Sequence, residues 1–206
     1  TRAVLIDSDG AHVGTATRSH SVAEPSADRA EHDAETVWWR ETLEVLRELS
    51  RRFPDDVRRV AAIGLSAVGA SIVPVDAMGR ALRPAILYGI DRRAQTQGRW
   101  LEDRLGSAKA RRRTGREFST QSVGPKILWI KEHEPEIAER TAKYLPPTAF
   151  LALRLGADAA IDPHTALAIH PLFRADRMEW DEEAVRLVCR PRQLPVVVAA
   201  GRPIGV

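Results

Sequence analysis

Two short segments of this 206-residue sequence carry residue types that could bind a ligand. In residues 64–71 (GLSAVGAS), small side chains at the end of an apolar run would let another molecule approach the backbone. In residues 88–93 (YGIDRR), an expected strand ends at a glycine and is followed by an acid and two arginines. Because α/β folds place ligands where strands end in loops, both segments are candidate binding sites.

Each segment also has a purely structural interpretation. The small residues of 64–71 would equally form a tightly packed bend. Asp91 would equally cap the helix that follows it, while Arg92 and Arg93 face solvent. The residues alone therefore leave both interpretations open.

The sequence contains no strong catalytic signature. A Walker-type phosphate loop, an HExxH pair and a nucleophile elbow are all absent. The histidines are at positions 12, 20, 32, 133, 164 and 170. Only 164 and 170 are close in sequence, so we expect these residues in loops or at helix ends and expect no metal site.

Strands are expected mainly in the first half of the chain. A hairpin is expected over residues 2–19 around the turn at 7–10, and strands at 60–65, 71–75 and 81–87. Between them, Asp33 is expected to cap a helix that ends at Phe53 and buries positions 37, 43, 46 and 49. Residues 21–32 show no periodicity.

Helices dominate the second half. They are expected at 92–105, from Pro125, over 135–145 and at 148–155, before an edge strand at 196–199. A leading antiparallel hairpin followed by a crossover helix favours an α/β fold in which helices cover a mixed sheet.

Composition excludes several classes of protein. The hydrophobic content of 44% excludes a disordered chain, and the longest apolar run, residues 61–75, is shorter than the ~20 residues of a membrane-spanning helix. A single cysteine, Cys189, excludes a disulfide framework and fits a reducing compartment. With no signal peptide at its start, the chain is expected to be cytoplasmic. The basic run 109–116 is expected to be a solvated loop.

Several motifs, in their order and spacing, resemble the FGGY family of carbohydrate kinases, which includes xylulokinase, gluconokinase and glycerol kinase. The first motif is GLSAVGASIVPVDAMGRALRPAILYGIDRRA, residues 64–94. The second is STQSVGPKILWIKEHEPEIAERTAKYL, which keeps the family pattern at Lys126, Trp129, Pro135 and Glu136. The similarity extends to the tryptophan of MEWDEE near the end of the chain.

This resemblance implies a ribonuclease H-like fold of the actin-type ATPase class, with a mixed sheet and flanking helices. Residues 1–206 would be the first of two domains, the N-terminal sugar-binding domain. The start of the phosphate hairpin and the whole C-terminal ATP-binding domain would be missing. Thr1 and Arg2 would remain from the nucleotide-binding hairpin, and the catalytic aspartate would lie beyond Val206. The fragment would then be inactive alone.

The implied activity is the ATP- and Mg²⁺-dependent phosphorylation of a sugar or polyol hydroxyl. The implied substrate-binding residues are Ser66, Gly69, Ala70, Tyr88, Asp91 and Gln121. Among them, Asp91 and Gln121 would hydrogen-bond sugar hydroxyls and Tyr88 would offer a ring face. Relatives carry larger side chains where this chain has Gly69 and Ala70, so its pocket would admit a substrate larger than glycerol or use backbone groups.

Two alternatives remain open. One is a non-catalytic domain that binds a sugar or a protein partner. The other is a nucleic-acid-binding domain that uses Arg111–Arg113, which a net charge of only +3 supports weakly. We expect a sugar or polyol as the partner, with no nucleic acid and no membrane, and a homodimer stays open.

Overall fold

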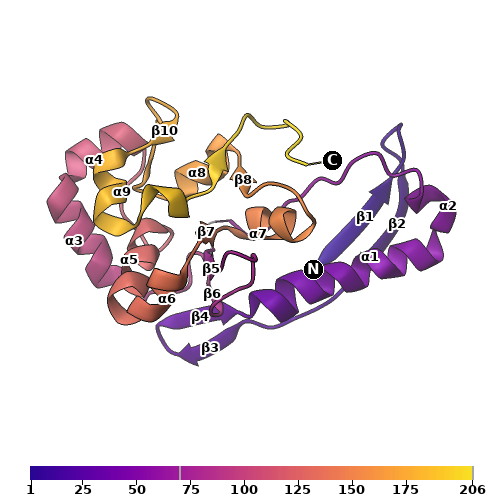
Figure 1. The fold of residues 1–206 in the computed structure, drawn as a ribbon, viewed down its shortest axis with the longest axis horizontal. Coiled ribbons are helices and arrows are strands. Elements are labelled where there is room, and N and C mark those ends of the chain that lie inside the picture. Colours follow the sequence, from indigo (N-terminus) through magenta and orange to yellow (C-terminus); the bar gives the residue numbers. More distant parts are fainter. Residues whose placement is uncertain (70, 206) are drawn as a thin grey trace.

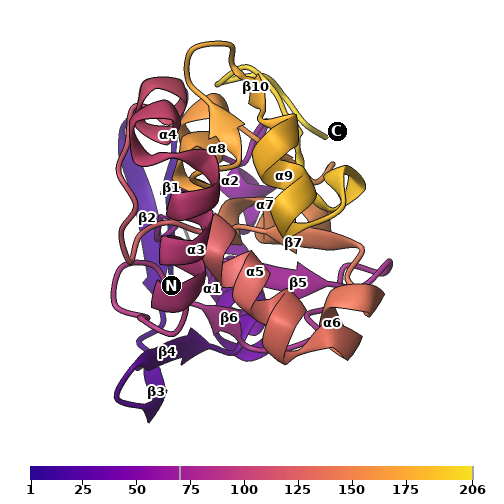
Figure 2. The same ribbon diagram turned by 90° about the vertical axis from the view of Figure 1, so that its left-hand side faces the viewer.

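The computed structural model of the chain describes residues 1–69 and 71–205. Figure 1 shows a long helix, α1, lying beneath the hairpin of β1 and β2 at one end of the molecule, and a group of helices at the other end. Figure 2 looks at that second end, where α3 and α5 pack side by side. The fold is therefore mixed α/β.

Helices alternate with short strands along the chain. The α-helices are α1 (Glu41–Arg52), α2 (Pro54–Val57), α3 (Gln95–Leu105), α4 (Ser107–Thr114), α5 (Gly124–His133), α6 (Pro135–Arg140), α7 (Pro147–Arg154), α8 (Pro163–Ala168) and α9 (Glu182–Val188). A π-helical segment, Ala34–Arg40, precedes α1, and a 3₁₀ turn, Pro191–Gln193, follows α9. The strands are β1 (Arg2–Ile6), β2 (His12–Thr17), β3 (Ala23–Ser26), β4 (Arg29–His32), β5 (Val73–Val75), β6 (Ala85–Ile86), β7 (Lys143–Leu145), β8 (Ala160–Ile161), β9 (Phe173–Arg174), β10 (Glu179–Trp180) and β11 (Val196–Val197).

Both antiparallel and parallel pairing occur among the strands. Within the described ranges, the antiparallel sets are β1–β2, β3–β4–β6, β5–β7 and β9–β10, and the parallel pair is β8–β11. The strands thus form small sheets, and an antiparallel bridge between Ile72 and Ile86 joins the start of β5 to β6.

Local signals place many of these elements where the sequence predicts them. The side chain of Asp33 accepts hydrogen bonds from the first turn of the π-helical segment, which confirms the cap. Gly106, with a φ of 78°, ends α3, and Pro125 lies in the first turn of α5. On α1, the buried positions are Thr42, Val45 and Leu49. Of the predicted apolar face, only Leu49 is buried.

Four predictions about elements are wrong. Residues 60–65 form no strand: no backbone hydrogen bond among the described residues joins 61–68 to a strand, and without such pairing extended backbone stays irregular. Residues 21–32 contain the hairpin β3–β4, so His32 lies in a strand, as His12 does in β2, and not in a loop or at a helix end. The helix at Pro135 ends at Arg140, because 143–145 pair with β5. The basic run lies in α4 and not in a loop.

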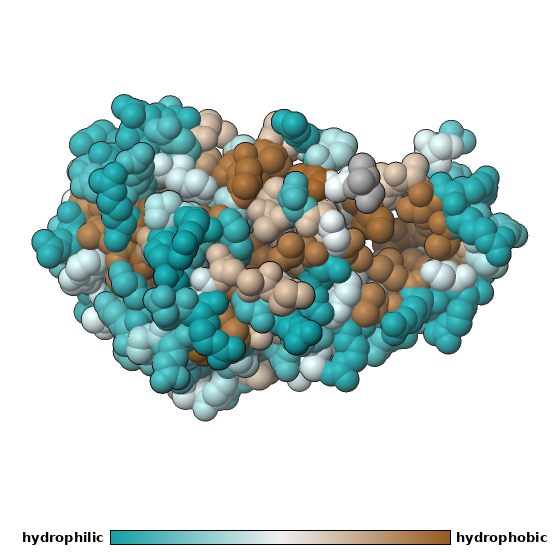
Figure 3. Space-filling model, viewed as in Figure 1, coloured by the Kyte–Doolittle hydropathy of each residue, from teal (hydrophilic) through white to brown (hydrophobic). Residues whose placement is uncertain are grey.

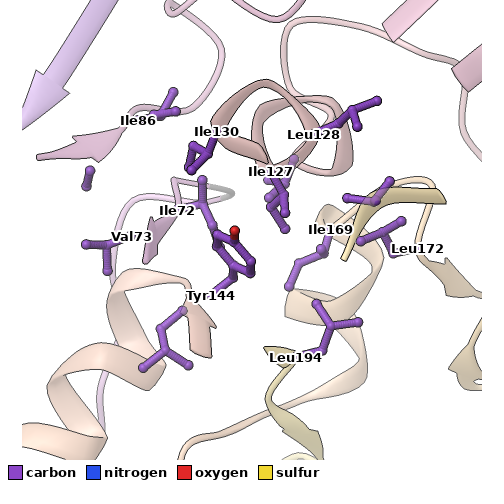
Figure 4. Close-up of a cluster of buried hydrophobic side chains, with 14 of the residues drawn as sticks. Ile72, Val73, Ile86, Ile127, Leu128, Ile130, Tyr144, Ile169, Leu172 and Leu194 are labelled. Atoms are coloured by element: carbon purple, nitrogen blue, oxygen red, sulfur yellow. The ribbon is translucent and has the colours of Figure 1, made fainter. Parts of the chain in front are cut away.

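The main core lies between β5, β7 and α5. In Figure 4, Tyr144 points into the middle of a cluster that includes Ile72, Ile127 and Ile169, all of them at most 1% exposed. A second, smaller cluster of Ala16, Val45 and Leu49 joins the hairpin to α1. Figure 3 shows apolar residues over the centre of one face and polar residues over its ends.

Candidate functional site

A cavity of about 270 Å³ opens beside α3, at the end of the molecule that carries most of the helices. Its walls come from the loop after β6, from α3 and from the segment that leads into α5. The lining residues are Asp91, Arg92, Ala94, Gln95, Gly98, Arg99, Glu102, Phe118, Ser119, Thr120, Ser122, Pro125 and Lys126. The cavity therefore offers hydroxyl, amide, carboxylate and guanidinium groups on mostly apolar walls, as small-molecule sites do.

Asp91 lies at the floor of this cavity, and its carboxylate is already engaged. The residue is 1% exposed. One carboxylate oxygen accepts a hydrogen bond from the backbone N–H of Ala30 at 2.8 Å. Both oxygens accept from the guanidinium of Arg93, the shortest contact being 2.6 Å from Nη2. Asp91 thus ties the loop after β6 to β4 and holds Arg93 in place.

A buried network of charges supports this floor. Arg93 also pairs with Glu31, 2.7 Å from its Nη1. Arg83 joins the same Glu31 to Glu134. The carbons Cζ of Arg93 and Arg83 lie 5.0 and 5.9 Å from the ring centroid of Trp129, within the range of cation–π attraction. The network fixes the loop against α5.

Lys126, on α5, supports the loop at its first residue. Its ammonium donates a hydrogen bond of 2.6 Å to the carbonyl of Leu87, and the residue is 1% exposed. Burial lowers the pKa of Lys126 to about 8, although the negative charge of Asp91 opposes this shift. Lys126 therefore fixes the point at which β6 turns into the cavity loop.

Tyr88 and Gly69 lie together, beside the cavity lining and not in it. The backbone N–H of Tyr88 donates to the hydroxyl of Ser71 at 3.1 Å. A Cβ placed on Gly69 would lie 3.6 Å from the Tyr88 ring, which is ordinary contact. Ser66 is exposed and also lies apart from the cavity. The predicted residue Ala70 lies outside the described residues.

Gln121 is exposed and is absent from the lining, although its neighbours Ser119, Thr120 and Ser122 line it. Of the predicted substrate-binding residues that the structure describes, Asp91 lines this cavity, together with Arg92 of the candidate segment 88–93. The cavity also uses α3 residues that sequence reasoning missed, including Arg99. Their signal was the helical spacing of positions 95, 99 and 102, which puts them on one face of α3.

The basic run of α4 lies near this cavity but is largely paired. Lys109 and Arg113 form ion pairs with Glu183 on α9, and Arg113 also reaches Asp181 at 2.9 Å. Arg111 pairs with Glu117 at 3.0 Å. The pairs of Lys109 and Arg113 hold α4 against the start of α9, whereas Arg112 and Arg116 form no ion pair among the described residues.

Known proteins that are similar to this chain identify its family. A model of the FGGY family of carbohydrate kinases, N-terminal domain, matches residues 1–206. The chain is 31% identical to the xylulose kinase of Streptomyces coelicolor, over all of this chain and 41% of that protein. It is also 31% identical to the xylulose kinase of Escherichia coli K12, over 88% of this chain and 36% of that protein. The chain belongs to the FGGY family of carbohydrate kinases.

The fold of this FGGY chain is shared with solved structures. The crystal structure of xylulose kinase from Rhodospirillum rubrum matches all of the chain with a TM-score of 0.90 at 24% identity, over 42% of that protein. The ribonuclease H-like, actin-type ATPase fold is thereby confirmed. The chain spans about two fifths of the length of these relatives.

Lys126 and Trp129, which match the sequence pattern of the family, lie in the buried network that supports the loop after β6. The hydroxyl of Thr1 donates to the carbonyl of Val37 and to the carboxylate of Glu41, at 3.2 and 2.7 Å, so it is turned toward α1. Arg2 is exposed on β1. In residues 1–69 and 71–205, no three His, Cys, Asp or Glu side chains gather as a metal site, and no helix is long and apolar enough to cross a membrane. The Thr1 hydroxyl is thus already used within the fold, while Arg2 is open to solvent.

Proposed function

We propose that the protein to which this chain belongs phosphorylates a sugar or polyol hydroxyl with ATP, and that this chain supplies most of the sugar pocket. The observation that carries the proposal is the cavity beside α3, built on a buried charge network in a chain of the FGGY family. Its volume of about 270 Å³ is near the lower end of the roughly 300–1,000 Å³ typical of small-molecule sites. That size suits a monosaccharide better than a nucleotide.

The cavity residues would recognise a polyhydroxylated molecule through both donors and acceptors. The hydroxyls of Ser119 and Thr120 can donate and accept, and the guanidinium of Arg99 donates only. The rigid floor at Asp91 keeps these groups in one arrangement, which lowers the entropy that binding costs. Arg92, in the loop after β6, adds a second guanidinium to that of Arg99.

The residues expected from the family resemblance would complete the pocket. Tyr88 would offer its ring beside Gly69. Ser66 and Ala70 would line the same side of the sugar pocket, which is wide because its residues are small. Gln121 lies next to the cavity loop and would reach a bound sugar from its rim. Asp91 would act mainly by holding the loop, with any direct sugar contact made from the cavity floor.

Phosphoryl transfer would also need a catalytic carboxylate and a nucleotide site. The carboxylate would take the proton from the sugar hydroxyl as the hydroxyl oxygen bonds to the γ-phosphorus of ATP, while the bond from that phosphorus to ADP breaks and ADP leaves. ATP would supply the phosphoryl group, and Mg²⁺ would neutralise phosphate charge. We place the carboxylate and the nucleotide site in the rest of the protein, with Thr1 and Arg2 near the phosphates. The compartment would be the cytoplasm.

The test is ADP release by the full-length protein with xylulose, gluconate and glycerol. Arg99→Gln should raise the KM for the sugar and leave the KM for ATP unchanged. Arg192→Gln, an exposed arginine that does not line the cavity, is the matched control and should change neither. An unchanged sugar KM in Arg99→Gln would refute the pocket assignment. Sugar binding without ADP release would instead support the non-catalytic alternative.

A further inference from the structure

The loop between α4 and α5 forms one wall of the cavity, yet it belongs to no sheet or helix. Its own hydrogen bonds centre on Ser122. The N–H of Ser119 donates to the Ser122 hydroxyl oxygen at 3.1 Å, and the N–H of Ser122 donates to the Ser119 carbonyl at 3.0 Å. The position of Ser119 at the cavity therefore depends on what holds Ser122.

His170, in the turn after α8, holds Ser122 from outside the loop. Nδ1 of His170 lies 3.0 Å from the Ser122 hydroxyl oxygen, and the two residues are 2% and 4% exposed. The His170 ring also meets the ring of Phe118 edge to face, with centroids 4.6 Å apart. One imidazole thus contacts both ends of the cavity wall.

The backbone brings the turn and the loop into direct contact. The N–H of Gly124 donates to the carbonyl of His170 at 2.8 Å. A Cβ on Gly124 would lie 3.0 Å from that carbonyl and 2.8 Å from Cδ of Pro171, so no larger residue fits without a shift. The distance between His170 and Ser122 is therefore fixed by close packing.

The direction of the hydrogen bond follows from the protonation state of His170. Burial lowers the pKa of His170 to about 4, and the positive charge of Arg116 acts in the same direction. The ring is thus neutral near pH 7. The Ser122 oxygen accepts from the N–H of Ser119 and still carries its hydroxyl proton, which can donate to Nδ1 when the proton of the neutral ring is on Nε2.

We propose that His170 is a positioning residue, whose neutral Nδ1 accepts the Ser122 hydroxyl and so holds Ser119 and Thr120 toward the sugar. This inference rests on the proposed function, since it concerns the wall of the same cavity. It requires a hydrogen-bond acceptor at position 170. If His170 only filled space in the core, any side chain of similar size and shape would serve at position 170, with or without an acceptor.

The experiment compares His170→Asn with His170→Leu in the full-length protein. Asparagine can present its Oδ1 as an acceptor near the place of Nδ1, whereas leucine cannot. His170→Leu should raise the sugar KM about tenfold, the worth of roughly one hydrogen bond to a neutral group. It should leave the KM for ATP unchanged. His170→Asn should recover most of the sugar affinity.

Ser122→Ala is the milder variant, for use if leucine at 170 prevents folding. It should raise the sugar KM as His170→Leu does, and the double variant should be no worse than either single one, because both remove the same bond. Equal sugar KM values in the asparagine and leucine variants would overturn the proposal. A wild-type sugar KM in Ser122→Ala would do so as well.

Amide hydrogen exchange separates this inference from the proposed function, because it needs no sugar. Exchange at the N–H groups of Ser119 and Ser122 should speed up in His170→Leu and in Ser122→Ala, and remain slow in His170→Asn. If the protein binds no sugar but this pattern holds, the pocket assignment fails and His170 still positions the loop. Unchanged exchange in all three variants would overturn the positioning role itself.

Discussion

Replacing Asp91 by asparagine tests whether this residue serves the framework of the cavity. The substitution keeps the shape of the side chain and removes its charge. An amide oxygen in the place of Oδ2 can still accept from the N–H of Ala30 and from Nη2 of Arg93. The amide NH₂ in the place of Oδ1 would face Nε and the backbone N–H of Arg93, donor against donor. The perturbation therefore falls on one buried ion pair.

The expected loss of stability follows from the contacts that remain. Removing one partner of a buried ion pair costs about 3–5 kcal/mol. Arg93 would keep Glu31 as a second partner at 2.7 Å. The remaining hydrogen bond to Ala30 would retain about 1 kcal/mol. We therefore expect Asp91→Asn to lower the free energy of unfolding by about 2–4 kcal/mol.

The assay is urea unfolding of the full-length protein, followed by circular dichroism, with the sugar KM measured below the transition. Asp176→Asn is the control, because its pair with Arg174 is exposed and exposed pairs add little. A change of less than about 1 kcal/mol in Asp91→Asn, with a large rise in sugar KM, would refute a framework role. It would instead make Asp91 a direct ligand of the sugar.

Three further predictions concern titration and the open side of the pocket. The pKa of Lys126 is lowered to about 8 from 10.5, so the folded state favours the neutral amine. The free energy of unfolding should therefore rise between pH 8 and 10.5, by up to about 3 kcal/mol. Lys126→Met should abolish this rise. The pKa of His170 is lowered to about 4 from 6.5, so stability should fall by up to about 3 kcal/mol as the pH drops from 6.5 to 4. His170→Asn should remove that fall, and a fall of equal size in the variant would assign it to other groups. Gly69→Met should leave the melting temperature unchanged, because a Cβ there meets Tyr88 at 3.6 Å, but should raise the sugar KM by narrowing the wide side of the pocket; an unchanged KM would place the sugar elsewhere.

The elements that sequence reasoning placed correctly are those specified by a few adjacent residues. The cap at Asp33, the glycine that ends α3 at Gly106 and the proline that begins α5 act within one helical turn. The hairpin at 23–32 was missed although its two strands are neighbours, because the segment is polar and shows no periodicity; β4 also pairs with β6, far along the chain. The strand at 143–145 was missed because its partner is distant in the sequence. For β7 the partner is β5, about 70 residues earlier, and no local pattern encodes such a pairing.

The sequence also does not predict which individual side chains face the cavity. In the sequence, Asp91 and Arg92 are neighbours, and both types of side chain can bind a ligand. In the structure, Asp91 turns inward to Arg93 and to Ala30, a residue 61 positions away, while Arg92 stays exposed and lines the cavity. The Asp91 carboxylate faces inward because the backbone N–H of Ala30 in β4 donates to it and the guanidinium of Arg93 lies beside it. In this chain Asp91 therefore holds the loop, and under the proposed function the groups that contact a sugar would come from Arg92, α3 and the wall that His170 supports.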